Sequence, residues 1–375
     1  MRFKWRPALF LVVLLALIGA VLVGCTGAGT QGWSGPVVDQ GVLYMGTLDG
    51  KVIALDAAKG VNVWQPFVIQ TSSGSSFGCS PAKVGAGLYS TPAISNDVLF
   101  VGDHEGKLYE LSLNGLAQRW FFDTGDDIIG SPVVANGIVY VGSSNGWLYA
   151  VKLDNGLQAW KFKTGGKIWS TPVVVDGVVY IGSLDRRVYA LNAADGTQVW
   201  TSPFVAAGAI SATPVVSGDT IYVAANDSRF YALNKRDGTL KWVFKGDGWF
   251  WATPAVSGDM LYATSLKGTV YAIQDLGTQP VVKRQFDLKV GVSAPPLLAN
   301  NELIVGDRKN AIHTFSLDGL PKSTVTFTSS IYAPMFADQT NLYVATRDHK
   351  IYSLDLGTKG IKWIFDTDQM TLVAR

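Results

Sequence analysis

The segments SPVVANGIVYVGSSNGWLYAVKLDNGLQAWKFKTG (131–165) and TPVVVDGVVYIGSLDRRVYALNAADGTQVW (171–200) carry one residue pattern twice in succession. The proline near the start of each segment recurs along the chain, first after 56 residues and then at intervals of 39–42 residues. These marker prolines are Pro36, Pro92, Pro132, Pro172, Pro214, Pro254, Pro295 and Pro334. Repeats with a period of about 20–50 residues are typical of solenoids and propellers.

Each repeat contains four stretches typical of short β-strands. In the unit that begins at Thr171, the apolar residues 173–175 precede the turn Asp176-Gly177. Residues 178–182 follow, then the turn Asp185-Arg186, then 188–191 and a last stretch that ends in Trp200. Asn-Gly or Asp-Gly often occupies the second turn, so we expect positive φ at both of its residues, as two-residue hairpins require. Four strands of about 5–6 residues with connections of about 4 residues account for the period.

Eight antiparallel four-stranded units at this period predict an all-β protein, an eight-bladed β-propeller that occupies residues 36–375. An insertion at about 66–88 explains the long first interval. The composition agrees, since the 375 residues include 41 Gly, 11% are aromatic and only 16% are charged. Disordered chains and coiled coils are excluded, because both need many more polar and charged residues.

A tryptophan recurs in the fourth stretch, usually four residues after a glycine. Because an indole offers a large apolar face, we expect it to cover the seam between adjacent blades. Phe286 and Phe327 stand roughly in its place in repeats six and seven. The regular pairs are Gly60 and Trp64, Gly156 and Trp160, Gly196 and Trp200, and Gly238 and Trp242, with Trp120 and Trp363 as variants.

The pattern Y-A-L-[DN]-x-x-x-G-x-x-x-W resembles the repeat of pyrroloquinoline quinone (PQQ)-like propellers, and this likeness covers nearly the whole chain after the first 35 residues. Some propellers of that family are dehydrogenases that hold PQQ and Ca²⁺ on the ring axis with acidic, Asn and Arg residues. They are usually much longer, and no residue here matches their cofactor ligands. We therefore expect no catalytic residue, no cofactor and no metal site. The candidate metal-binding residues are the pair Asp126-Asp127 and the histidines His104, His313 and His349, and an ordinary loop or strand position explains each of them better.

The first residues are typical of an export signal. Three basic residues precede an apolar run from 8 to 23, which is short for a membrane span. The run ends in Leu22-Val23-Gly24-Cys25, which resembles the lipobox of bacterial lipoproteins. We predict a signal peptide over 1–24, lipidation of Cys25 and a short tether over 25–35. The alternative is an uncleaved anchor helix with an unmodified Cys25.

Either alternative places the rest of the chain outside the cytoplasm and attached to a membrane. Cleavage after Gly24 changes the net charge from +2 to −1, so we expect no nucleic-acid partner. If Cys25 is lipidated, Cys79 is the only remaining cysteine, and an intrachain disulfide is excluded.

One face of the predicted ring carries residues that depart from the repeat, because interblade loops and second-to-third-strand turns of a propeller lie on the same side. Trp, Tyr and Arg together are typical of protein-binding surfaces. Alternatively, Trp169 and Trp251 belong to the core at the channel mouth, and the arginines form a solvated rim. The candidate partner-binding residues are Tyr89, Trp169, Trp249, Phe250, Trp251, Tyr332, Arg186, Arg187, Arg229, Arg308 and Arg347.

A lipid-anchored propeller of this repeat type resembles the BamB-type lipoproteins of the outer-membrane β-barrel assembly machinery. The resemblance implies a monomeric, non-catalytic scaffold that binds another envelope protein. Two alternatives stay open: a surface lipoprotein that binds a polysaccharide or the cell wall, and a small PQQ-dependent oxidoreductase.

Overall fold

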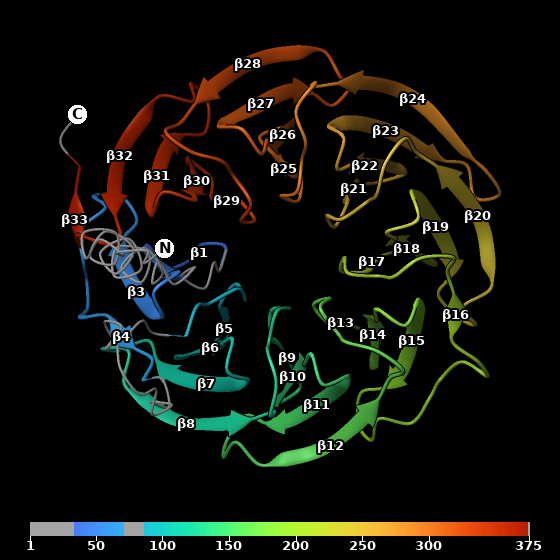
Figure 1. Ribbon diagram of the computed structural model, residues 1–375, viewed down its shortest axis with the longest axis horizontal. Helices are drawn as coiled ribbons and strands as arrows, with labels where there is room; N and C mark the ends of the chain where they lie inside the picture. Colours follow the sequence, from blue (N-terminus) through green and yellow to red (C-terminus); the bar gives the residue numbers. More distant parts are fainter. Residues whose placement is uncertain (1–33, 71–85, 374–375) are drawn as a thin grey trace, which may run out of the picture.

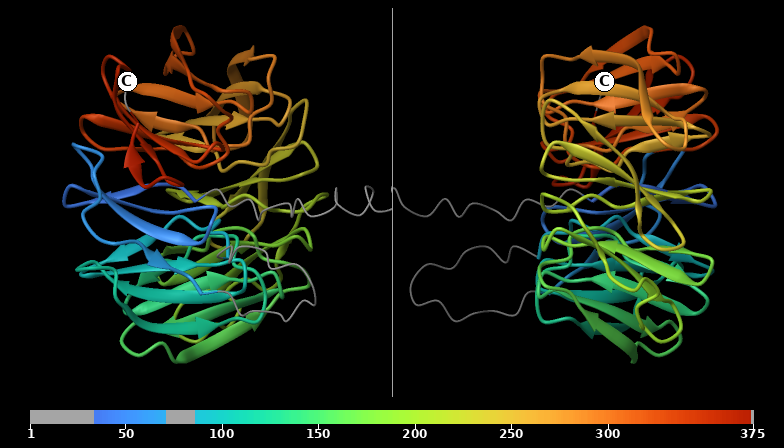
Figure 2. Two further views of the ribbon diagram at one scale, coloured as in Figure 1. Left: turned by 60° about the vertical axis from the view of Figure 1, so that its left-hand side comes forward. Right: turned by 90° about the vertical axis from the view of Figure 1, so that its right-hand side faces the viewer.

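The computed structural model describes residues 34–70 and 86–373, which form eight antiparallel sheets in a ring. Figure 1 views the ring along its axis, with the first strand of each blade nearest the axis and the last at the rim. Edge-on, the blades form a thick disk (Figure 2). Every helix or strand assigned in the described residues is a strand, and the predicted all-β, eight-bladed propeller of four-stranded antiparallel blades is confirmed.

The blades follow one another along the chain. Blades one to four comprise β1 (Val37–Asp39), β2 (Val42–Gly46), β3 (Lys51–Asp56), β4 (Phe67–Val68); β5 (Ala93–Ser95), β6 (Val98–Gly102), β7 (Lys107–Ser112), β8 (Gln118–Asp123); β9 (Val133–Ala135), β10 (Ile138–Gly142), β11 (Trp147–Lys152), β12 (Gln158–Lys163); and β13 (Val173–Val175), β14 (Val178–Gly182), β15 (Arg187–Asn192), β16 (Phe204–Val205). Blades five to eight comprise β17 (Val215–Ser217), β18 (Thr220–Ala224), β19 (Arg229–Asn234), β20 (Leu240–Lys245); β21 (Ala255–Ser257), β22 (Met260–Thr264), β23 (Thr269–Asp275), β24 (Pro280–Asp287); β25 (Leu297–Ala299), β26 (Glu302–Gly306), β27 (Ala311–Ser316), β28 (Pro321–Thr326); and β29 (Phe336–Ala337), β30 (Asn341–Thr346), β31 (Lys350–Asp355), β32 (Ile361–Asp366), with β33 (Thr371–Leu372) as a fifth strand.

Among residues 34–70 and 86–373, no strand is exchanged between the two ends of the ring. Blades one and eight are each built from one continuous stretch of chain, and β33 pairs with β32 of its own blade. Side chains join the two blades instead: the Trp363 indole N–H donates to the Ala57 carbonyl at 3.0 Å, and Leu43, Ile53 and Phe365 share one apolar cluster. Apolar packing therefore holds the closure.

The first and second turns of a blade differ in conformation. In blades one, three, four and seven the first turn has positive φ at both residues, as at Asp176 (51°) and Gly177 (75°), which suits a two-residue hairpin. In the second turn of blade four only Arg186 has positive φ (74°), because four residues connect β14 to β15. The Asp185 carboxylate supports this longer turn by accepting the Arg187 N–H at 2.9 Å. The expected positive φ at both residues of the second turn is therefore wrong, and this conformation occurs in the first turn instead.

The recurrent tryptophan covers the seam between blades, as predicted. Four of the indoles lie against a glycine of the next blade, and a Cβ at Gly238 would approach the Trp200 ring to 2.5 Å. These four indoles belong to Trp120, Trp160, Trp200 and Trp363. The Trp200 indole N–H donates to the Lys235 carbonyl of that blade at 3.1 Å. Gly238 also has φ of +74°, which favours glycine. In blades one, three, four and five, the glycine of this spacing therefore contacts the tryptophan of the preceding blade.

In blades six and seven, other residues occupy the position of the seam tryptophan. Arg284 occupies the tryptophan's register in blade six, opposite Ala272, and Ser323 occupies it in blade seven, opposite Thr314. Phe286 lies two residues further along, opposite Val270, and Phe327 lies beyond the end of β28. The expectation that these phenylalanines take the tryptophan's place is wrong, because the connection between the third and fourth strands is longer in blade six and shorter in blade seven than in the blades with the tryptophan.

A buried ion cluster fills the seam between blades seven and eight. Lys359 stands where other blades have the seam glycine, with φ of +62°, and is 5% exposed. Its ammonium donates to Glu302 Oε2 at 2.7 Å, while Lys322 donates to Glu302 Oε1 at 2.9 Å. Burial alone would raise the pKa of Glu302, but the hydrogen bonds from Lys359 and Lys322 outweigh it and lower this pKa.

Several predicted features fall outside the described residues. These are the signal peptide at 1–24, the lipidation site Cys25 and nearly all of the tether at 25–35, together with Cys79 and the centre of the insertion at 66–88. Within residues 34–70 and 86–373, no helix has the length and apolar character that a membrane span requires.

Candidate binding face and channel mouth

Interblade loops and second turns meet on one side of the ring, here called the loop face. In the turn after each second strand, a backbone N–H donates to a carbonyl of the preceding interblade loop. Examples are Leu184 to Lys167 at 2.8 Å and Leu266 to Trp249 at 2.9 Å. The predicted shared face is therefore confirmed. Because the bond recurs from blade to blade, backbone pairing fixes the height of the side chains on this face.

A funnel of about 440 Å³ opens at the centre of the loop face. Its walls include four of the predicted aromatic residues: Tyr89, Trp169, Trp251 and Tyr332. Trp169 and Trp251 come from loops two blades apart, and their rings meet edge to face with centroids 6.2 Å apart. The Trp169 indole N–H donates to Ser144 Oγ at 3.1 Å, which holds the ring in place. Both tryptophans are half-buried, so they combine packing with an exposed surface.

Trp249 and Phe250 are neighbours in one loop, but they face opposite ways. Trp249 is 53% exposed on the loop face. Phe250 is 1% exposed and packs between blades five and six. Its position matches that of Ile168 and Ile210, which are also fully buried at their seams. Phe250 is therefore a core residue, and its inclusion in the predicted binding face is wrong.

Arg308 and Arg347 meet over the ring of Tyr332. Their guanidinium carbons lie 5.3 and 5.8 Å from its centroid, and Arg308 Nε donates to the Tyr332 hydroxyl at 3.3 Å. The two arginines belong to the second turns of blades seven and eight, so the fold brings them together from 39 residues apart. This corner joins an aromatic ring to two cations, an arrangement common in protein interfaces.

The other three arginines lie apart from this corner, in blades four and five. Arg187 and Arg229 face carboxylates of their own turns, with 3.8 Å from Arg187 to Asp185 and 3.4 Å from Arg229 to Asp227. The Tyr189 hydroxyl donates a hydrogen bond to Asp185 Oδ2 at 2.5 Å. Burial, together with this bond to Asp185, raises the pKa of Tyr189 to about 12. Arg186 is exposed at the tip of its turn.

The acidic pair Asp126-Asp127 lies beside the funnel. Asp127 Oδ1 is 3.3 Å from His104 Nδ1, and the His104 ring packs on Tyr89 with centroids 5.3 Å apart. Burial and the charge of Asp127 raise the pKa of Tyr89. His313 and His349 each lie beside a single carboxylate, Asp307 and Asp368 respectively. No group of three metal-binding side chains occurs among the described residues.

The funnel wall also carries a set of Ser and Thr hydroxyls that were not predicted from the sequence. The backbone N–H of one blade donates to a hydroxyl of the next in five consecutive bonds of 2.9–3.1 Å. We call these hydroxyls the hydroxyl arc; they belong to Thr91, Ser131, Thr171, Thr213 and Thr253.

The arc ends at blade seven because Pro295 and Pro334 occupy its next two positions and have no side-chain hydroxyl. The marker prolines Pro295 and Pro334 therefore lie one residue earlier in their blades than the other six marker prolines. The signal in the sequence was a Ser or Thr directly before the marker proline. Ser90 and Ser170, each one residue before a member of the arc, have a structural role instead, since each binds the end of its blade's second strand.

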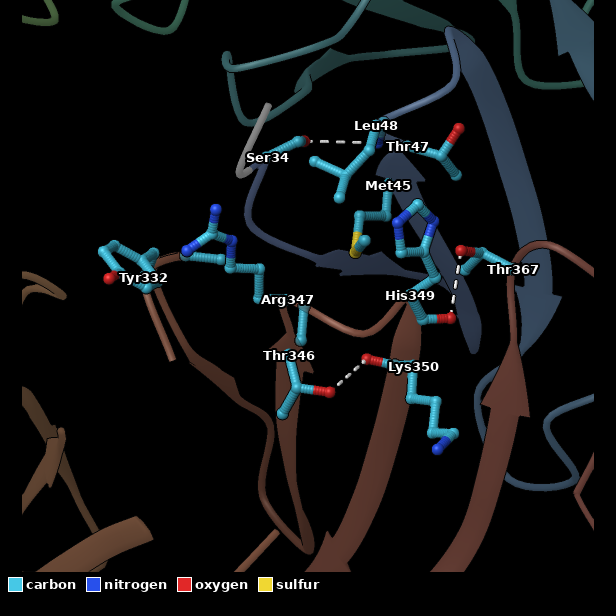
Figure 3. Close-up of a pocket in the computed structure, with 13 residues that line it drawn as sticks. Ser34, Met45, Thr47, Leu48, Tyr332, Thr346, Arg347, His349, Lys350 and Thr367 are labelled. Carbon is cyan, nitrogen blue, oxygen red and sulfur yellow. Dashed lines mark hydrogen bonds between the residues drawn. The ribbon is translucent and has the colours of Figure 1, made fainter. Parts of the chain in front are cut away.

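A second hollow lies between blades eight and one on the same face. Figure 3 shows it between Met45, Thr346, Arg347 and His349, with the Thr346 hydroxyl bonded to the Lys350 carbonyl. Its volume of about 40 Å³ accommodates only a few water molecules. The funnel is the larger site.

The described funnel residues do not fit PQQ and Ca²⁺. Calcium takes about 6–8 oxygen ligands, usually with several carboxylates. The one carboxylate among the described lining residues is Asp127, which faces His104. No Arg or Lys is among these residues to bind the carboxylates of the quinone.

Comparisons with known proteins agree with this architecture. A sequence model of the family described as outer membrane protein assembly factor BamB matches residues 69–170 and 144–365. The crystal structure of BamB from Moraxella catarrhalis is similar with a TM-score of 0.70 at 17% identity, over 83% of this chain and 93% of that chain. The computationally designed Ika8 protein is similar with a TM-score of 0.72 at 12% identity, over 87% and 97%. At these identities the structures show the fold alone. A search of curated proteins finds no match.

Proposed function

The chain belongs to the family described as outer membrane protein assembly factor BamB, and from this premise we propose that it is a non-catalytic, protein-binding scaffold in outer-membrane protein assembly. In this proposal the propeller is monomeric and binds another envelope protein through its loop face. The family match extends from residue 69 to 365, so it includes most of the ring and its loops.

The exposure of Trp249 on the loop face is the observation that carries the binding proposal. Protein-binding sites are enriched in Trp, Tyr and Arg, and an exposed indole is a strong anchor when a partner buries it. Arg308 and Arg347 on Tyr332 supply a second anchor on the same face. Arg186 adds an exposed cation at the rim. These residues suit a partner with acidic and apolar groups.

The predicted signal peptide and lipidation site at the N-terminus form the second part of the proposal. Removal of residues 1–24 and acylation of Cys25 would hold the propeller at a membrane outside the cytoplasm. Two or three acyl chains suffice for stable attachment. Replacement of Cys25 by Ser should abolish incorporation of labelled palmitate and release the protein from the membrane fraction. Incorporation that persists in this variant contradicts the predicted lipidation site.

Crosslinking in native membranes tests the scaffold proposal. The full chain is crosslinked, purified and analysed for bound envelope proteins, with Trp249→Ala and Arg308→Ala as the binding variants. Leu276→Ala is the matched control, because Leu276 is 51% exposed but lies in the turn between β23 and β24, away from the loop face. We expect the two loop-face variants to lose the partner and the control to keep it.

Two results would contradict the proposal. One is equal recovery of partner proteins by all three variants. The other is reduction of an electron-acceptor dye after addition of PQQ and Ca²⁺, which would indicate an oxidoreductase.

A further inference from the structure

The hydroxyl arc presents hydrogen-bond donors to the funnel. Each of its five oxygens accepts one backbone N–H from the preceding blade. A hydroxyl also carries one donor hydrogen. Within residues 34–70 and 86–373, no acceptor within hydrogen-bond distance takes these hydrogens. Because the five residues line the funnel, an acceptor must come from water or from a ligand inside it.

Two aromatic rings line the same funnel as this arc. Trp169 and Trp251 meet edge to face, and Ser144 anchors the first of them. The face of an indole carries negative charge density and attracts the weakly positive C–H groups of a ligand. The funnel thus combines O–H donors with aromatic surface.

The funnel favours an uncharged ligand. Among its described lining residues, the only acidic or basic side chains apart from the tyrosines are Asp127 and His104, whose Oδ1 and Nδ1 atoms lie 3.3 Å apart. Arg308 and Arg347 lie nearby but do not line it. A phosphate or carboxylate ligand would therefore find no cation at its binding site.

From this geometry we infer that the funnel binds a neutral saccharide. A sugar ring has C–H groups on its face for Trp169 and Trp251, and oxygen acceptors around its edge for the hydroxyl arc. The volume of the funnel, about 440 Å³, lies within the range of roughly 300–1000 Å³ that small-molecule sites occupy. The funnel shares Tyr332 with the proposed protein-binding surface, whereas Trp249 lies outside the funnel lining.

Titration of the full chain with defined sugars tests the inference. The chain is purified in a detergent without a sugar headgroup and titrated with maltotriose, cellotriose and triacetylchitotriose. Calorimetry measures the affinity, and saturation-transfer NMR identifies the sugar protons that contact aromatic rings. We expect saturable binding of at least one sugar, with the strongest transfer to ring C–H protons.

Variants locate the site. Trp169→Ala and Trp251→Ala should each weaken binding about tenfold or more, whereas Trp249→Ala should change it less than about twofold. Trp249 is the matched control, since it lies two residues from Trp251 but outside the funnel lining. Thr253→Ser should retain binding and Thr253→Val should weaken it. Circular dichroism checks that each variant folds. If Trp251→Ala does not fold, Trp251→Phe replaces it in the titration.

The outcomes separate this site from the scaffold. Loss of sugar binding in the funnel variants, with partner crosslinking unchanged, supports the inference. It is overturned if none of the three sugars binds, or if binding survives both tryptophan variants. Trp249→Ala tests the scaffold proposal independently, so either proposal can fail alone.

Discussion

Replacement of Lys359 by Met should destabilise the propeller at one seam. Met keeps the length and apolar stem of the side chain but removes the ammonium that lies 2.7 Å from Glu302. Glu302 is only 8% exposed, and the loss of one partner from a buried ion pair costs about 3–5 kcal/mol. Since Lys322 still donates to Glu302 at 2.9 Å, we expect the lower end, about 3 kcal/mol.

Urea denaturation followed by tryptophan fluorescence measures this loss at pH 7. The cost should also depend on pH, because the pKa of Glu302 is lowered in the folded state. A lowered carboxyl pKa stabilises the fold above the unfolded pKa of about 4.3, and this stabilisation is lost as the pH falls through the folded value. The difference between wild type and variant should therefore be constant from pH 7 to about 5.5 and shrink below about pH 4.

Two controls isolate the charge effect. Lys289→Met removes a lysine whose side chain is 83% exposed, and its ion pair with Asp287 should contribute little because water screens it. Ser323→Trp combined with Lys359→Gly recreates the tryptophan-glycine contact of the other seams and should recover part of the loss. A cost below about 1 kcal/mol for Lys359→Met refutes the reasoning that the ion cluster holds this seam.

Three further predictions concern the seams, the core and the turns. Gly238→Ala should cost at least about 2 kcal/mol more than Gly177→Ala, because both have φ near +75° but only the first would press a Cβ on Trp200; urea denaturation measures both. Phe250→Ala should cost about 3–5 kcal/mol and Trp249→Ala less than about 1 kcal/mol, and equal costs contradict our placement of Phe250 in the core. Burial raises the pKa of Tyr189 and of Tyr271 to about 12, so these tyrosines should remain neutral in the folded protein at pH 11. Because unfolded tyrosine ionises near pH 10, their contribution to stability is present below about pH 10 and is lost as the pH rises to about 12, which ultraviolet titration checks against Tyr189→Phe.

The repeat made most of the fold predictable. Hydrophobic strands of five or six residues, separated by Gly-containing turns at a constant period, have few ways to bury both faces except by stacking side by side in a ring. The role of the seam tryptophans followed from the same spacing. Blades six and seven were predicted less well, because a connection of different length between their third and fourth strands places Arg284 and Ser323 in the tryptophan's register.

The candidate site was predicted only in part. Periodicity indicates which loops share a face, but it does not show which side of a loop a residue occupies. Trp249 and Phe250 are adjacent and chemically alike, yet one is exposed and the other is core. The hydroxyl arc was missed because its five members lie 40 or 42 residues apart, and each bond needs a partner from the next blade.

Local chemistry in the sequence determined the strands, the turns, the number of blades and the shared loop face, since these depend on residue type and spacing within one repeat. Tertiary structure decided how the ring closes, how Lys359 and Glu302 replace a tryptophan seam, and how Trp169 and Trp251 meet in the funnel that the hydroxyl arc lines. The physical reason is that these contacts join different blades. Their geometry depends on how neighbouring sheets pack, and a single repeat contains no information about that packing.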